Sequence, residues 1–130
     1  MTRMDSNNGN MLYKELSYEV MSAVFEVHNV LGSGFLEKVY ENALMAELTL
    51  RGITAEPQKP LIVRFKGVEV GCFCADIVVN GLILLELKAV ETLIKAHEAQ
   101  ILNYLKATGL DLGILINFGK ERVESKRFVL

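Results

Sequence analysis

The sequence predicts a single α/β domain with a mixed sheet, and three observations lead to this prediction. The chain has 130 residues, of which 51% are apolar and 23% charged, as in an ordinary globular domain that buries its own core. Segments with helical and strand-like apolar spacing follow one another in the order α, α, β, β, β, α, β. Asn80-Gly81 separates two apolar runs and is the strongest hairpin signal in the chain.

The first two elements are expected to be helices. One apolar face predicts a helix over residues 12–31, and it comprises Leu12, Leu16, Val20, Val24, Val27 and Leu31. Gly32-Ser33-Gly34 breaks this helix, and a second one is expected over residues 36–51. Its apolar stripe is Leu36, Tyr40, Ala43, Leu44 and Leu48. The start of the chain is polar, so we expect residues 1–10 to be flexible and residues 11–130 to form the domain.

Three strands are expected next. Residues 61–65 and 68–79 predict two strands joined by a turn at Lys66-Gly67, after a loop at residues 56–60. An almost purely aliphatic strand then covers residues 82–90. Consecutive strands joined by short turns form an antiparallel meander.

One helix and at least one strand complete the prediction. Helical spacing returns over residues 91–107 and ends at Gly109. The expected buried stripe of this helix is Leu93, Ala96, Ala99, Leu102 and Leu105. A buried strand follows over residues 112–118, and the charged tail after it could add an edge strand. Because the helix is long enough for a crossover, the strands before and after it could be parallel.

Two charged residues interrupt the most apolar strand. Glu86 and Lys88 lie within LILLELKAV, although charged side chains are rarely buried unless they are paired. The hairpin brings Asp76 beside Glu86, and two carboxylates in an apolar setting bind a hard cation such as Mg²⁺. Lys88 could then orient or deprotonate a water, or stabilise charge on a phosphate. The alternative is a solvated ion pair between Glu86 and Lys88 at the end of the strand.

The length of the hairpin loop decides whether the two carboxylates share a face. A two-residue loop at Asn80-Gly81 would put Asp76 opposite Leu85 and leave Glu86 on the other face of the sheet. A three-residue loop, either 79–81 or 80–82, would put Asp76 and Glu86 on the same face. A shared metal site therefore requires an odd loop or a bulge before Asp76, although Asn-Gly favours the even loop.

Two further stretches carry polar residues at helical spacing. In GSGFLEKVYENAL, Glu37 opens the second helix and Tyr40 lies one turn further on the same side. A capping interaction, with Glu37 reaching back to a glycine cap, would also explain this stretch. In HEAQILNYLKATG, His97, Gln100 and Tyr104 share one helix face, and a solvated polar face is the alternative interpretation.

These stretches together resemble a known family. GFLEKVY resembles the motif that names the GxxExxY family, and Asp76 with Glu86-Leu87-Lys88, followed by QxxxY at residues 100–104, is similar to the core of the PD-(D/E)XK nuclease superfamily in its exonuclease-like branch. The resemblance covers about residues 18–118 and implies a restriction-endonuclease-like αβββαβ core with an extra N-terminal helix. The chain departs from the pattern in having no proline before Asp76.

The resemblance also implies an activity and the residues that carry it. The expected protein is a metal-dependent nuclease that hydrolyses phosphodiester bonds of nucleic acid, DNA rather than RNA, with Mg²⁺ or Mn²⁺ as its cofactor. Asp76 and Glu86 would bind the metal, and Glu37 would approach it directly or through water. Lys88 would be the catalytic lysine. Gln100 and Tyr104 would orient Lys88 or contact the nucleic-acid backbone.

Alternatives to a nuclease stay open. The chain could be a catalytically silent nuclease-fold module for binding or assembly, although a decayed site usually loses one of its charged residues. It could also be an interaction protein that binds through its long first helix. The formal net charge of −2 gives no support for tight non-specific binding to nucleic acid, so the hypothesis includes a protein partner that recruits DNA. A small, apolar-rich chain could also form a homodimer. With no apolar run of about 18 residues and no apolar leader segment, we expect a cytoplasmic protein away from membranes.

Overall fold

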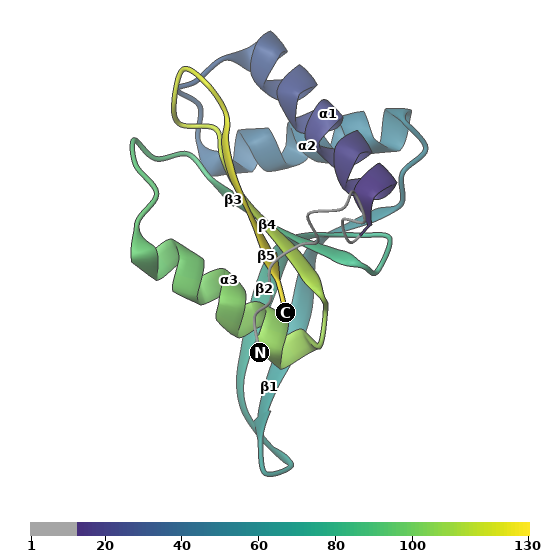
Figure 1. Ribbon diagram of the computed structural model, residues 1–130, viewed down its shortest axis with the longest axis vertical. Coiled ribbons are helices and arrows are strands. Elements are labelled where there is room, and N and C mark those ends of the chain that lie inside the picture. The colour runs from purple at the N-terminus through teal and green to yellow at the C-terminus, as the bar shows by residue number, and fades with distance from the viewer. Residues whose placement is uncertain (1–12) are drawn as a thin grey trace.

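The computed structural model describes residues 13–130, which form a five-stranded mixed sheet with helices on both faces (Figure 1). In chain order the elements are α1 (Lys14–Leu31), α2 (Glu37–Leu50), β1 (Ala55–Phe65), β2 (Val68–Val79), β3 (Ile83–Lys88), α3 (Lys95–Thr108), β4 (Leu112–Asn117) and β5 (Glu124–Val129). The predicted α/β class is confirmed. The expected flexible segment 1–10 and Leu12 lie outside the described residues. No helix within residues 13–130 is long and apolar enough to cross a membrane.

The five strands lie in the sheet in the order in which they occur in the chain. Strands β1, β2 and β3 pair antiparallel as the predicted meander. Helix α3 then carries the chain across one face of the sheet, so β4 pairs parallel to β3, as expected. The charged tail supplies the further strand β5, which pairs antiparallel to β4 at the edge.

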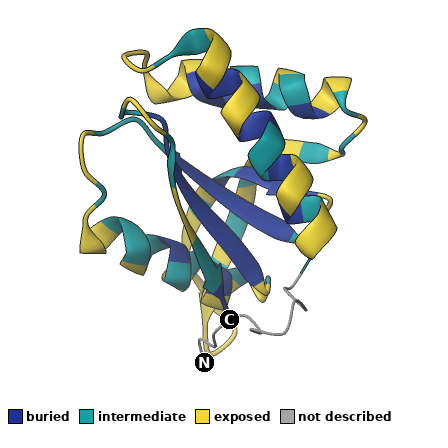
Figure 2. Ribbon diagram, turned by 45° about the horizontal axis from the view of Figure 1, so that its top comes forward, coloured by how far each residue is buried: buried dark blue, intermediate teal, exposed yellow. Residues whose placement is uncertain are grey.

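Two hydrophobic cores lie on opposite faces of the sheet. Helices α1 and α2 cover one face and α3 covers the other (Figures 1 and 2). The α3-side core consists of Ala75, Val78, Leu84, Ile101, Leu105 and Leu115. Figure 2 shows the buried residues concentrated in the central strands. Because β3 is covered on both faces, its sequence is almost continuously apolar.

Two of the expected elements were wrong in detail. Residues 56–60, expected to be a loop, belong to β1, because an edge strand tolerates the prolines that a central strand would reject. Of the predicted stripe of α3, Leu105 is buried and Leu93 packs against the α3-side core, but Ala96 and Ala99 are exposed. Ile101, which was not predicted, is the second buried residue of this helix. Gly113 on β4 explains this orientation, since a Cβ there would lie 2.9 Å from the Ile101 side chain.

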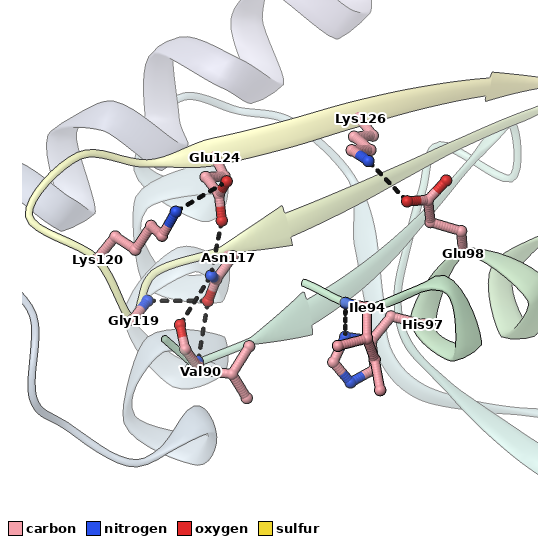
Figure 3. A network of polar contacts seen from close by, with 9 residues as sticks. All are labelled: Val90, Ile94, His97, Glu98, Asn117, Gly119, Lys120, Glu124 and Lys126. Atoms are coloured by element: carbon pink, nitrogen blue, oxygen red, sulfur yellow. Dashed lines mark hydrogen bonds and ion pairs between the residues drawn. The ribbon is translucent and has the colours of Figure 1, made fainter. Parts of the chain in front are cut away.

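Asn117, which is fully buried, fastens the segment that follows β3 to the end of β4 (Figure 3). Its Oδ1 accepts hydrogen bonds from the backbone N–H groups of Val90 and Gly119, both at 3.0 Å. Its Nδ2 donates to the Val90 carbonyl at 2.8 Å and to Glu124 Oε1 at 3.1 Å. A Cβ at Gly119 would lie 2.3 Å from the Val90 backbone, so the contact requires glycine. The chain just after Lys88 is thereby held against the sheet.

Candidate functional site

The hairpin between β2 and β3 has the odd register that a shared carboxylate site requires. The strand pairs nearest the turn are Val79 with Ile83, Val78 with Leu84 and Ile77 with Leu85. The loop is therefore 80–82. The regular pairing ends at Ile77 and Leu85, and continuing its register by one residue would set Asp76 opposite Glu86. The tight turn predicted at Asn80-Gly81 does form, since Leu82 N–H donates to the Val79 carbonyl at 2.9 Å. The register differs from that of an even hairpin because Leu82 is left out of the pairing.

The regular pairing of β2 with β3 stops next to Asp76, whose carboxylate accepts a hydrogen bond from the β3 backbone. Asp76 Oδ2 accepts from the backbone N–H of Leu87 at 2.7 Å, and the regular β2–β3 pairing stops at Ile77, the residue that follows Asp76 on β2. Ala75 and Val78 both belong to the α3-side core, although strict alternation would put them on opposite faces. The alternation therefore breaks between them, next to Asp76, and irregularities of this kind re-aim side chains at active sites.

Glu86 is a buried carboxylate whose hydrogen bonds are incomplete. Its residue is 5% exposed, and its Oε1 has no hydrogen-bond partner among the described residues. Burial raises its pKa to about 8, and the charges of Asp76 and Glu37 add to this rise. The backbone N–H of Asp76 and the ammonium of Lys88 act in the opposite direction. A buried oxygen without a donor is expected to bind a proton or a cation.

Lys88 is joined to a chain of contacts on α3. Its Nζ donates to Gln100 Oε1 at 3.4 Å, and Gln100 Nε2 donates to the Tyr104 hydroxyl at 2.5 Å. The Tyr104 ring stacks on Phe73 with centroids 3.7 Å apart. The alternative of an ion pair between Glu86 and Lys88 is not supported, since none joins them within residues 13–130. The predicted polar helix face thus lies against the site and is half-buried.

Glu37 is the first residue of α2, with Leu36 as the N-cap and no side-chain capping bond. The capping interaction that could have explained Glu37 is therefore absent at this described helix end. Burial raises the pKa of Glu37, Lys88 lowers it and Asp76 raises it. These influences mean that the carboxylate lies close enough to Lys88 and Asp76 for their charges to interact.

Tyr40 has a structural role and is not part of the candidate site. Its side chain is fully buried, and its ring stacks on Phe118 with centroids 4.6 Å apart. Its hydroxyl donates to the Gly32 carbonyl at 2.6 Å and accepts from the Phe35 N–H at 3.2 Å. Tyr40 therefore fixes the α1–α2 loop, and with it the position of Glu37.

Sequence reasoning missed two polar residues beside the carboxylates. Glu41 on α2 is 5% exposed, and its Oε1 accepts from Gln58 Nε2 at 2.6 Å. Gln58 on β1 also reaches Asp76 Oδ1 at 3.5 Å. The spacing of Glu41, one turn after Glu37, could have indicated it, because both side chains then share a helix side. Gln58 lies in the supposed loop and carried no such signal.

The residues present fit a hard divalent cation held by two carboxylates. The carboxylates of Asp76 and Glu86 lie close enough for their charges to interact, and the Glu86 oxygen without a partner has the chemistry of a metal ligand. Within residues 13–130, no three His, Cys, Asp or Glu side chains are grouped closely enough to hold a metal by themselves. Mg²⁺ commonly takes one or two carboxylates and fills its remaining positions with water and phosphate oxygens. Glu37 is thus suited to an interaction through water.

A separate cavity of about 720 Å³ lies beside the start of α1. Its walls include Tyr18, Met21, Ile114 and Ser125. Asp76, Glu86 and Lys88 do not contribute to it, so the size of a cavity does not locate the charged site.

The raised pKa of Glu86 predicts how stability depends on pH without metal. Below about pH 4.5 the Glu86 carboxyl is protonated in both the folded and the unfolded chain, so its ionisation does not lower the free energy of unfolding. Between about pH 4.5 and 8 the Glu86 carboxyl is ionised in the unfolded chain but stays largely protonated in the folded chain, so the free energy of unfolding falls as the pH rises. In EDTA, the melting temperature should therefore fall from pH 5 to pH 8.

Glu86→Gln should remove most of this fall and should melt at least about 5 °C above wild type at pH 8. The raised pKa values of Asp76 and Glu37 account for a remainder. Scanning calorimetry of both proteins at the two pH values tests this, with the exposed Glu121→Gln as control. An equal fall in wild type and Glu86→Gln would show that Glu86 is not the titrating group.

Comparisons with known proteins identify the superfamily and support the fold. A family model described as the PD-(D/E)XK nuclease superfamily matches residues 14–128. The crystal structure of SSO0001 superposes with a TM-score of 0.55 at 18% sequence identity, which supports the fold alone. The alignment covers 90% of this chain but 59% of SSO0001, so the chain spans little more than half of that protein's length. No curated protein matched the chain.

Proposed function

The chain belongs to the PD-(D/E)XK nuclease superfamily, and from this premise we propose that it hydrolyses phosphodiester bonds of nucleic acid, with DNA as the favoured substrate. The observation that carries the proposal is the neighbouring pair of half-buried Asp76 and buried Glu86, in which Glu86 keeps an oxygen without a partner. Lys88 lies near both carboxylates without forming an ion pair with Glu86. A carboxylate pair with an ammonium beside it that is not ion-paired to Glu86 suits phosphoryl chemistry better than structural support.

Each residue of the proposed site has a role that its contacts support. Asp76 and Glu86 would hold Mg²⁺ or Mn²⁺, which supplies Lewis-acid polarisation of the phosphate when bound. Lys88 keeps its ammonium available because Gln100 contacts it through a neutral carbonyl oxygen. It can therefore orient the attacking water or stabilise charge on the phosphate. Glu37 would accept a hydrogen bond from water in the site.

Gln100 and Tyr104 have an orienting role in this proposal. Gln100 cannot rotate freely, because Tyr104 binds its amide nitrogen while the oxygen faces Lys88. Tyr104 is in turn fixed by its stacking on Phe73. The same face of α3 could also contact the backbone of the nucleic acid. The motif of Gly34, Glu37 and Tyr40 supports placing the chain more narrowly in the GxxExxY family and the exonuclease-like branch.

A cleavage assay with divalent ions tests the proposed function. The chain is incubated with linear and circular double-stranded DNA, single-stranded DNA and RNA, each with Mg²⁺, Mn²⁺ or EDTA. We expect cleavage of at least one DNA form in Mg²⁺ or Mn²⁺ and none in EDTA, because the carboxylates need a cation to approach a phosphate. Divalent binding without cleavage of any substrate would contradict the activity and favour the silent binding module.

A further inference from the structure

Gln58 occupies an irregular position in β1, directly across from Asp76. The pairs on either side are Pro57 with Ile77 and Lys59 with Ala75, but Gln58 and Asp76 do not pair. Gln58 has a φ of 48°, a left-handed conformation that is unfavourable for a residue with a side chain. Strained residues of this kind gather at functional sites, where the surrounding structure holds them.

The Gln58 side chain lies between two carboxylates. Its Nε2 donates to Glu41 Oε1 at 2.6 Å and makes a longer contact with Asp76 Oδ1 at 3.5 Å. Glu41 is a firm anchor, since it is 5% exposed and its Oε2 is paired with Lys38 Nζ at 2.7 Å. The charges of Glu41 and Asp76 repel each other, and an amide N–H₂ group between them offers a donor to both.

Both carboxylate oxygens of Asp76 have a hydrogen-bond contact. Oδ1 faces the Gln58 amide and Oδ2 accepts from the Leu87 N–H at 2.7 Å. A carboxylate held at both oxygens has one preferred orientation. Second partners of this kind set the orientation of ligating groups and change metal affinity when they are removed.

We propose that Gln58 is a positioning residue for Asp76, which it orients through an amide anchored on Glu41. The proposal rests on the proposed function in one respect, because the orientation of Asp76 has chemical consequences only if Asp76 binds a metal. Gln58 itself touches neither the metal nor the substrate. Its strained backbone aims the amide at the site, and the side chain rather than the backbone carries the effect.

The variant Gln58→Gly separates this role from a general structural one. Glycine adopts a φ of 48° without strain, so the variant relaxes the backbone while it removes the amide. The melting temperature of the metal-free protein should stay the same or rise. The dissociation constant for Mn²⁺, measured by calorimetry, should increase about 10- to 100-fold. A residue that only supported the strand would instead lower the melting temperature and leave the affinity unchanged.

A matched control and a metal-free measurement complete the test. Lys66, in the turn between β1 and β2, also has a left-handed φ, 50°. Lys66→Gly therefore relaxes the backbone in the same way, and this variant should bind Mn²⁺ like wild type. In the absence of metal, amide hydrogen exchange at Leu87 should be about 10-fold faster in Gln58→Gly, because its acceptor Asp76 is no longer held.

The outcomes distinguish this inference from the proposed function. Weaker Mn²⁺ binding together with faster exchange at Leu87 would support it, whereas wild-type values of both would overturn it. If wild type binds no Mn²⁺, the proposed function fails at the metal site. The exchange rate of Leu87 still decides whether Gln58 orients Asp76.

Discussion

Replacing Lys88 with alanine is expected to reduce metal-dependent cleavage by roughly 10²–10⁴-fold. The side chain interacts electrostatically with Asp76, Glu86 and Glu37, so in the proposed site its charge would face the phosphate. It is not a metal ligand and its contact with Gln100 is long, at 3.4 Å. The fold and the binding of divalent ions should therefore persist. Single-turnover cleavage rates and melting curves with and without Mn²⁺ measure the two properties separately.

Two further variants make the interpretation of Lys88→Ala specific. Lys88→Met keeps the length and packing of the aliphatic stem but loses the charge, so it should be as inactive as Lys88→Ala. Lys106→Ala removes an exposed lysine from the last turn of α3 and should cleave like wild type. A large loss of melting temperature in both Lys88 variants would mean that the lysine is structural. Cleavage at the wild-type rate would exclude it from the reaction.

Periodicity within single segments predicted most of the fold. The buried face of α1 and the aliphatic strand β3 each carry a local pattern that one packing arrangement satisfies. The parallel pairing of β3 with β4 followed from the length of the helix between them. These predictions succeeded because each depends on neighbours in the sequence.

Features that depend on contacts between distant segments could not be predicted from periodicity. The rotation of α3 depends on the room that Gly113 leaves for Ile101, and no spacing within α3 contains that information. The segment 56–60 is a strand because it lies at the edge of the sheet, which only the complete sheet determines. Composition suggested a loop because proline and charged residues are common in loops.

Some residues of the candidate site could be predicted from local sequence patterns, and others depended on contacts between distant segments. Asp76, Glu86 and Lys88 stood out because their charges interrupt apolar strands, but their common face depended on whether Leu82 pairs. The sequence left both registers open, and the preference of Asn-Gly for an even loop pointed to the wrong one. Gln58 could not be predicted because its partner Glu41 lies on another element.

Asp76→Asn is expected to abolish the stabilisation that Mg²⁺ or Mn²⁺ gives the wild-type protein. A cation at 100 times its dissociation constant stabilises the folded state by about 2.7 kcal/mol. For a domain of this size, that corresponds to a rise in melting temperature of roughly 10 °C. The amide removes one of the two carboxylate ligands while its oxygen can still accept from the Leu87 N–H. Melting curves across a titration of Mn²⁺ measure the effect.

The metal-free form of the same variant gives an independent check. The negative charge of Asp76 raises the pKa of Glu86, so replacing Asp76 with a neutral amide relieves a repulsion on the buried Glu86 carboxylate. Metal-free Asp76→Asn should therefore melt at the wild-type temperature or above it. Asp111→Asn, at an exposed position, should show the full wild-type response to Mn²⁺. Equal shifts for wild type and Asp76→Asn would mean that the cation binds elsewhere, because a site built on Asp76 and Glu86 cannot lose a carboxylate without losing affinity.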